Sequence, residues 1–115
     1  MKRRLTLEVV AVLVATVALL IFSMRHGAAL AKPTTHAVSI ENMQFQPDVV
    51  AASGGDTIVW TNKDLFPHTV TSTSGGFDSH EIKPGESWTY RVSKAGELAY
   101  VCSLHPTMKA MLRVT

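Results

Sequence analysis

The sequence predicts an all-β domain, a small β-sandwich, preceded by an N-terminal signal or anchor helix. The chain has 115 residues, which leaves room for one ordinary domain. Hydrophobic residues make up 46% and charged residues 17% of the chain, a composition that folds. From residue 32 onward, apolar and polar residues alternate in short runs between turn residues, with no helical periodicity longer than about two turns.

Residues 1–31 have the pattern of a signal peptide. Lys2-Arg3-Arg4 form a positive segment, Val9 to Phe22 form an apolar stretch of 14 residues, and Ala29-Leu30-Ala31 form a small-x-small cleavage site. Cleavage after this site leaves residues 32–115 as the mature domain. We expect that domain in the periplasm, outside the cytoplasm.

An uncleaved membrane anchor is the alternative for this segment. Leu5 to Met24 approaches the roughly 20 apolar residues that a membrane span needs, whereas Glu8 within that window favours cleavage. A membrane is therefore a partner only if the leader is uncleaved. Positive residues stay inside in both cases, so residues 32–115 lie outside the cytoplasm.

The charge of the domain excludes nucleic acid as a partner. The formal net charge is +2, but four of the eleven basic residues precede residue 32. From there on, seven Lys and Arg residues are set against eight Asp and Glu residues. A nucleic-acid interface needs clustered basic residues to neutralise phosphates, and no such cluster is present.

Eight strands are expected, bounded by residues that favour turns. They cover residues 36–40, 44–45, 49–52, 57–62, 69–72, 87–92, 97–102 and 111–115. The clearest turns are Ser53-Gly54-Gly55-Asp56, Ser74-Gly75-Gly76, Lys83-Pro84-Gly85-Glu86 and Lys94-Ala95-Gly96. Turn signals about 8 to 12 residues apart suggest a small antiparallel sandwich.

A period of two along the strands predicts which residues share a face. Three such sets are Ile58, Trp60 and Asn62; Trp88, Tyr90 and Val92; and Leu98, Tyr100 and Cys102. Their aromatic side chains are expected to fill the core of the sandwich.

Cys102 is the only cysteine, so the exported domain has no internal disulfide. A single thiol outside the cytoplasm is a buried residue placed by chance, half of an intermolecular disulfide or a metal ligand held as thiolate. Its neighbours favour the third, because Cys102, His105 and Met108 form a C-x-x-H-x-x-M pattern. Thiolate, imidazole and thioether suit copper, which binds two His and one Cys with a long axial Met in blue-copper sites.

A second histidine is needed to complete that set, and His68 is the candidate. It ends the run Trp60-Thr61-Asn62-Lys63-Asp64-Leu65-Phe66-Pro67-His68 and precedes a predicted strand. A ligand at this position is held by the sheet, while Cys102 and His105 come from the loop that leaves a neighbouring strand.

These residues resemble the cupredoxins, the type 1 blue copper family, and within it the amicyanin-like and plastocyanin-like domains. Two residues separate His105 from Met108, as in amicyanins. The resemblance spans about residues 38–115 and includes Pro67-His68, His105-Pro106, Phe77-Asp78-Ser79 and Pro84-Gly85-Glu86-Ser87. It implies that residues 32–115 form a Greek-key β-sandwich that binds one type 1 copper through His68, Cys102, His105 and Met108.

Two positions depart from the pattern of the relatives. Thr69 stands where many relatives carry an Asn that ties the two ligand loops together, and it still offers a hydroxyl and a backbone N–H. Ala110 stands where Gly is common, and a loop that needs a positive φ there would be strained.

The resemblance implies an exported electron carrier that is not an enzyme. Its expected partners are redox proteins, a donor dehydrogenase and a cytochrome-like acceptor, and the carrier itself is expected to be a monomer. The alternative is a periplasmic copper-trafficking or resistance protein that holds copper without shuttling electrons.

Other candidate residues are expected to have ordinary structural roles. Met111 is a second candidate for the axial ligand, but it alternates out of phase with Met108. His36 and His80 are expected to be solvated surface residues. Met43 is expected to fill the core.

Overall fold

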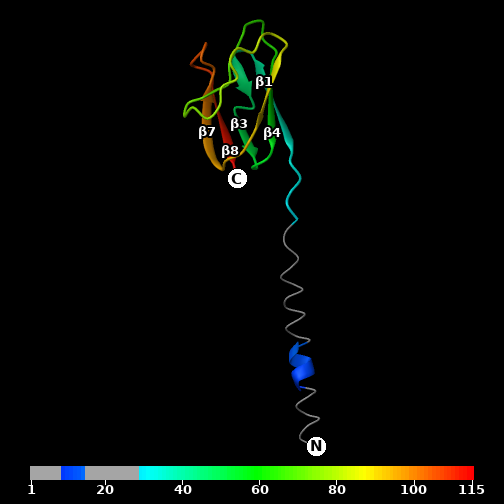
Figure 1. Ribbon diagram of the computed structural model, residues 1–115. Helices are drawn as coiled ribbons and strands as arrows, with labels where there is room; N and C mark the ends of the chain where they lie inside the picture. Colours follow the sequence, from blue (N-terminus) through cyan, green and yellow to red (C-terminus); the bar gives the residue numbers. More distant parts are fainter. Residues whose placement is uncertain (1–8, 15–28) are drawn as a thin grey trace, which may run out of the picture. The chain divides into compact units, whose positions relative to one another are not determined.

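The computed structural model of the chain describes residues 9–14 and 29–115 (Figure 1). Residues 9–14 are helical and exposed, while the rest of the predicted signal peptide up to residue 28 lies outside the described residues. In the part of the chain that is described, no helix is long and apolar enough to be a candidate membrane span. Residues 32–115 form one compact unit.

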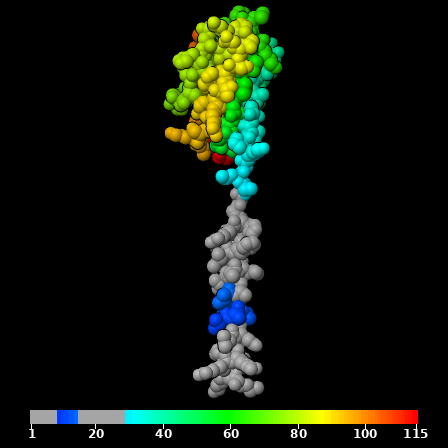
Figure 2. Space-filling model, turned by 45° about the vertical axis from the view of Figure 1, so that its right-hand side comes forward, coloured from blue at the N-terminus to red at the C-terminus, as the bar shows by residue number. Residues whose placement is uncertain are grey.

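Two four-stranded sheets make up this unit, with strand orders β2-β1-β4-β6 and β3-β8-β7-β5. The strands are β1 (Thr35–Glu41), β2 (Gln44–Gln46), β3 (Val49–Ala52), β4 (Thr57–Asn62), β5 (Thr71–Ser72), β6 (Ser87–Arg91), β7 (Gly96–Val101) and β8 (Lys109–Val114). In Figure 2 the cyan, green and yellow segments that contain β1, β4 and β6 lie beside one another on the visible face of the domain.

The predicted β-sandwich is confirmed, but both of its sheets are mixed, so the prediction that it is antiparallel is wrong for two strand pairs. β1 pairs with β4 in parallel, and β3 pairs with β8 in parallel. The reason lies in the connections between the sheets. β3 belongs to the second sheet, and the chain returns to place β4 beside β1 in the same direction. Alternation along a strand does not encode such pairing between distant strands.

The predicted strand 69–72 is also shorter than expected, because β5 begins at Thr71. The three residues before it use their backbone N–H groups elsewhere. His68 N–H donates to the carbonyl of Ile82, Thr69 N–H to the sulfur of Cys102, and Val70 N–H to the hydroxyl of Ser79. This segment is thus fixed by loop contacts instead of a strand ladder.

The core contains the alternate residues predicted from the sequence. Ile58, Trp60 and Asn62 are fully buried. The indole N–H of Trp60 donates to the hydroxyl of Tyr100 at 3.2 Å, and burial raises the pKa of Tyr100 to about 12. Trp88 and Tyr90, in contrast, are only half-buried and pack against the core from the edge strand β6.

The direction of β7 determines where the predicted metal ligands lie. Gly96, at its start, pairs with Val114 near the C-terminus, and Val101, at its end, pairs with Lys109. The loop after β7 therefore lies at the end of the domain opposite the C-terminus (Figure 1).

At the end of the domain where the C-terminus lies, His36 has a partner and is not the solvated residue that was expected. Its Nε2 atom lies 2.8 Å from Oδ2 of Asp56, and only 26% of the His36 side chain is exposed. The backbone N–H groups of Ser53 and Thr34, with His36, hold the pKa of Asp56 at about 2 instead of 3.8. The carboxylate of Asp56 therefore joins β1 to the turn before β4.

This carboxylate makes the stability of the domain depend on acid pH. Because the pKa is depressed in the folded state, the contribution of Asp56 is present above about pH 4 and is lost as the pH falls through about 2. We expect urea unfolding measured from pH 5 to pH 2 to show a loss of stability that is smaller in Asp56→Asn. The control Asp78→Asn, at an exposed aspartate 3.8 Å from His80, should retain the wild-type slope. An unchanged slope in Asp56→Asn would contradict this assignment.

Candidate metal centre

Cys102 follows β7 directly and is fully buried. The loop after it is closed by its own backbone hydrogen bonds. His105 N–H donates to the carbonyl of Cys102, Met108 N–H donates to the carbonyl of His105, and Cys102 N–H donates to the carbonyl of Met108. The C-x-x-H-x-x-M segment thus forms a compact loop whose residues are held in fixed positions.

His68 enters the same region from the segment between β4 and β5. Its backbone makes two hydrogen bonds with Ile82, of 3.1 Å and 2.7 Å, and its side chain is fully buried. The side-chain amide of Asn62 fixes the approach to His68, because it donates to the carbonyls of Phe66 and Ile82. Alternation predicted that Asn62 shares a face with Ile58 and Trp60, but it predicted no role for Asn62 in the site.

The structure brings together three of the four predicted ligands through their donor atoms. Nδ1 of His68, Sγ of Cys102 and Nδ1 of His105 all lie within 4.8 Å of one another. The sulfur is 3.8 Å from Nδ1 of His68 and 3.6 Å from Nδ1 of His105. Within the described residues this is the single cluster of three or more His, Cys, Asp or Glu side chains able to hold a metal.

These separations fit a metal ion bound between the donor atoms. Bonds of about 2.3 Å to sulfur and about 2.0–2.1 Å to nitrogen, as zinc makes, place the two donors about 3.5–3.8 Å apart for angles between about 109° and about 120°. The observed distances of 3.6 Å and 3.8 Å fall in that interval. Of the metals that accept imidazole and thiolate, copper is favoured when a thioether completes the set.

Met108 is the thioether nearest to this cluster along the loop. It is 3% exposed, and its backbone is bonded to both Cys102 and His105. Met111 instead lies within β8, paired with Val49 and Ala99, and alternates with the fully buried Leu112. The loop therefore favours Met108 over Met111 as the axial donor.

Thr69 connects the two ligand loops. Its backbone N–H donates to Sγ of Cys102 at 3.2 Å, and its hydroxyl accepts from the backbone N–H of Ser103 at 2.8 Å. The backbone N–H and the hydroxyl of Thr69 thus both form hydrogen bonds between the two loops. Ala110 lies within β8 and is not among the non-glycine residues with positive φ, so its substitution for Gly brings no strain.

Asp64 lies in the run that leads to His68, and the sequence pattern predicted no role for it. Its Oδ2 atom lies 2.9 Å from Nε2 of His68, and the carboxylate also accepts from the N–H groups of Asn42 and Met43. Burial raises the pKa of Asp64, but the bonds from Met43, Asn42 and His68 outweigh it and lower the pKa overall. In the sequence, the sign of this contact is that Asp64 precedes His68 by four residues.

This carboxylate selects the form of the imidazole that a metal needs. With Oδ2 accepting at Nε2, the proton of His68 sits on Nε2, and the lone pair of Nδ1 points to the cluster with Cys102. Asp64 is therefore a positioning residue for the metal centre.

Exposed apolar side chains lie in the segments that carry the two histidines. Leu65 is 88%, Phe66 60% and Leu104 50% exposed. His105 is partly exposed, whereas Met108 is buried and forms no part of this surface.

Two of the remaining predicted candidates differ in outcome. His80 has a side chain that is 89% exposed, as expected. Met43 is 39% exposed, so the expectation that it fills the core is wrong. Asn42 and Met43 form a tight turn with positive φ, and this turn keeps the side chain of Met43 out of the core.

Comparison with known proteins assigns the family. The profile described as a cupredoxin-like domain matches residues 11–114. The chain therefore belongs to the cupredoxin-like family, whose cofactor is copper. His68, Cys102 and His105, with Met108 in the same loop, have the donor set of a type 1 copper site.

Amicyanins and plastocyanins are among the relatives that match. Amicyanin-alpha of Methylorubrum extorquens is 28% identical over 82 residues, covering 67% of this chain and 69% of the relative. Chloroplastic plastocyanin of Tetradesmus obliquus is 33% identical over 72 residues, covering 53% of this chain and 50% of the relative. The chain thus spans half the length of that plastocyanin.

Solved structures give the same fold. The Cu(I) form of an amicyanin mutant matches with a TM-score of 0.67 at 25% identity, over 76% of this chain and 88% of that one. A copper-containing nitrite reductase from Thermus scotoductus matches with a TM-score of 0.67 at 27% identity, but only 24% of its chain is covered.

Replacing Asp64 tests its role in positioning His68. We expect Asp64→Asn to lower the affinity for Cu(II) by about 10–100-fold, the usual loss when a carboxylate behind a metal-binding histidine is removed. The reduction potential should rise, because the negative charge of Asp64 stabilises Cu(II) more than Cu(I), and the variant removes that charge. Chelator competition and voltammetry measure both quantities. Asp78→Asn is the control, and wild-type affinity in Asp64→Asn would contradict the role.

Proposed function

We propose that this protein is an electron carrier that holds one type 1 copper through His68, Cys102, His105 and Met108. The observation that carries the proposal is the cluster of one thiolate and two imidazole donors, with sulfur-to-nitrogen distances of 3.6 Å and 3.8 Å. Amicyanin and plastocyanin relatives support it.

When bound, copper supplies a one-electron couple between Cu(II) and Cu(I). The residues around it keep the donors in place in both states. The backbone bonds within the loop 102–108 and the contacts of Thr69 with Cys102 and Ser103 leave these donors little freedom to move. Hydrogen bonds to the cysteine sulfur also tune the reduction potential of such sites, and the backbone N–H of Thr69 makes one.

A carrier fits this chain better than an enzyme. The match to the nitrite reductase covers only 24% of that chain, whereas the match to the amicyanin mutant covers 88% of its chain. The compact unit of residues 32–115 corresponds to one such domain.

The burial of the ligands also favours a carrier over a copper-trafficking protein. His68 and Cys102 are fully buried and Met108 is 3% exposed. A protein that hands copper to a partner needs ligands that the partner can reach, and these side chains are covered.

We further propose that redox proteins dock over His105. The exposed side chains of Leu65, Phe66 and Leu104 belong to the segments next to the two histidines. Transient redox complexes are typically small, burying less than about 1,200 Å², and a patch of this kind suits them. A donor dehydrogenase and a cytochrome-like acceptor are the proposed partners of a monomeric carrier.

Export is the proposed reason for residues 1–31. The site Ala29-Leu30-Ala31 is exposed and without regular structure, with Leu30 98% exposed, which suits access by a peptidase. The mature carrier, residues 32–115, would then work in the periplasm.

Absorption spectra test the ligand assignment. With Cu(II) added, we expect the wild-type chain to show an intense thiolate-to-copper charge-transfer band and Cys102→Ser to show none, because the thiolate is lost. Met111→Leu should keep the band unchanged, since Met111 lies in β8 away from the ligand loop. Loss of the band in Met111→Leu but not in Met108→Leu would overturn the axial assignment.

Mass spectrometry of the protein from cell fractions tests export. We expect a mature chain that begins at Lys32 in the soluble envelope fraction, because cleavage follows Ala31. An intact mass that retains the leader, found with membranes, would identify the segment as an anchor.

A further inference from the structure

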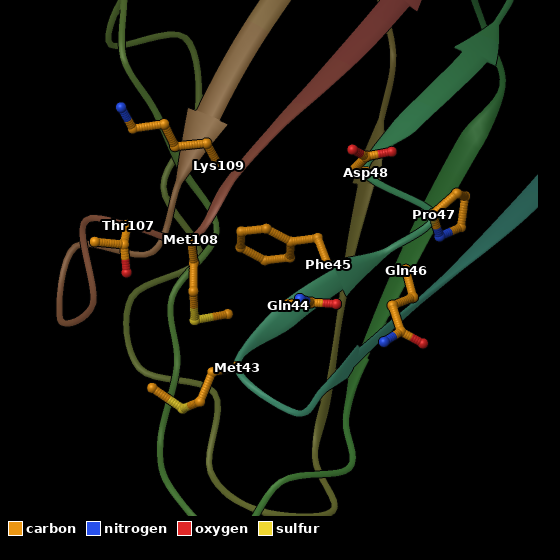
Figure 3. A pocket seen from close by; sticks show the side chains of 9 residues that line it. All are labelled: Met43, Gln44, Phe45, Gln46, Pro47, Asp48, Thr107, Met108 and Lys109. Atoms are coloured by element: carbon orange, nitrogen blue, oxygen red, sulfur yellow. The ribbon is translucent and has the colours of Figure 1, made fainter.

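A pocket of about 440 Å³ lies beside the ligand loop. Residues 43–48, from the turn and strand β2, form one part of its wall, and residues 107–109 form the other (Figure 3). Phe45, which is 3% exposed, and Met108 are the buried residues of this lining.

Met43 lines this pocket from an unusual backbone position. Asn42 and Met43 have φ values of 54° and 58°, in the left-handed region. Asn tolerates that region well, whereas an ordinary side chain such as Met is disfavoured there. Because Glu41 pairs with Gln44, these two residues form a two-residue hairpin turn of the kind that takes positive φ at both positions, so the hairpin fixes the backbone of Met43.

The surroundings that fix this turn include the carboxylate of Asp64. It accepts from the N–H of Asn42 at 2.7 Å and from the N–H of Met43 at 3.0 Å. The same carboxylate binds Nε2 of His68. The backbone of Met43 is thus linked to His68 through the carboxylate of Asp64.

Two thioethers line the pocket, Met43 at its exposed edge and Met108 at its buried end. In Figure 3 both side chains extend into the lower part of the view, while the ammonium of Lys109 points away from them. Thioethers are soft donors that select Cu(I) over hard cations. Asp48 and Lys109 also line the pocket with opposite charges, so the thioethers are the groups of this lining that favour a soft ion.

We propose that Met43 is the acceptor for incoming Cu(I) and that this pocket is the entrance through which the site is loaded. The inference rests on the proposed function, since it assumes that the final ligands are His68, Cys102, His105 and Met108. The thioether of Met43 first displaces one ligand from the complex that delivers the Cu(I). The ion then passes to the thioether of Met108 within the same pocket. The thiol of Cys102 loses its proton to solvent as its sulfur binds the ion, so that charge balances and no electron is transferred.

The experiment measures loading of the full-length chain without metal. Cu(I), supplied without oxygen as its acetonitrile complex, is mixed with the protein, and samples are oxidised with ferricyanide at intervals to read the charge-transfer band. We expect Met43→Leu to load Cu(I) about tenfold more slowly, at the low end of the loss when a group that supports a metal site is removed. Its final band and its loading by Cu(II) sulfate should match the wild type.

Two further variants separate the thioether from other effects. Met43→Gly also lacks the thioether but relieves the positive φ, so it should load as slowly as Met43→Leu. Met111→Leu removes a methionine outside the pocket and should load at the wild-type rate. Fast loading by Met43→Gly would assign the effect to the backbone and overturn the proposal.

The remaining outcomes also decide the matter. Equal Cu(I) loading in wild type and Met43→Leu would place the entrance elsewhere, while the band itself would leave the proposed function intact. Equal slowing with Cu(II) would make the pocket a general opening with no soft-metal acceptor, which also overturns the proposal. A wild-type chain that forms no band with either ion would instead refute the proposed function.

Discussion

The metal centre depends on the contact that Thr69 makes between two loops far apart in the chain. Its N–H bonds to the sulfur of Cys102 and its hydroxyl bonds to the N–H of Ser103. Because Thr69 follows His68 directly, these bonds set how far the first imidazole lies from the thiolate. Each loop is closed by its own backbone bonds, but those bonds do not fix one loop against the other. The pairing of β5 with β7 brings the same two segments together, because Thr71 pairs with Val101 directly before Cys102. The geometry that accepts a metal therefore follows from the bonds of Thr69 added to this strand pairing.

Burial then determines which atoms are left for the metal. A polar group removed from water is costly unless it is bonded. Nε2 of His68 is bonded to Asp64, and no buried side-chain N or O atom of the described residues lacks a partner. The Nδ1 atoms of His68 and His105 face the sulfur of Cys102 at distances too long for strong hydrogen bonds, 3.8 Å and 3.6 Å. The protein satisfies its other buried polar groups and keeps these three donors directed at a common point.

The sequence predicted what short-range patterns encode. Alternation identified the eight strands and the buried face of β4, and the spacing within residues 102–108 identified three candidate donors on one loop. It missed the parallel pairing of β1 with β4, because that pairing depends on which sheet β3 joins. It also missed the role of Asp64, whose hydrogen bonds reach Asn42 and Met43 across more than 20 residues. Met43 itself was misplaced in the core because hydrophobicity alone does not reveal a left-handed turn.

The surfaces around the centre differ in the side chains that they offer. On the His105 side, the exposed Leu65, Phe66 and Leu104 offer apolar surface with no soft donor beyond the ligand itself. On the Met108 side, the pocket places a second thioether, that of Met43, where solvent reaches it. Asp64 bonds to both His68 and the turn of Met43, so a strained surface turn and a buried ligand are held by the same carboxylate.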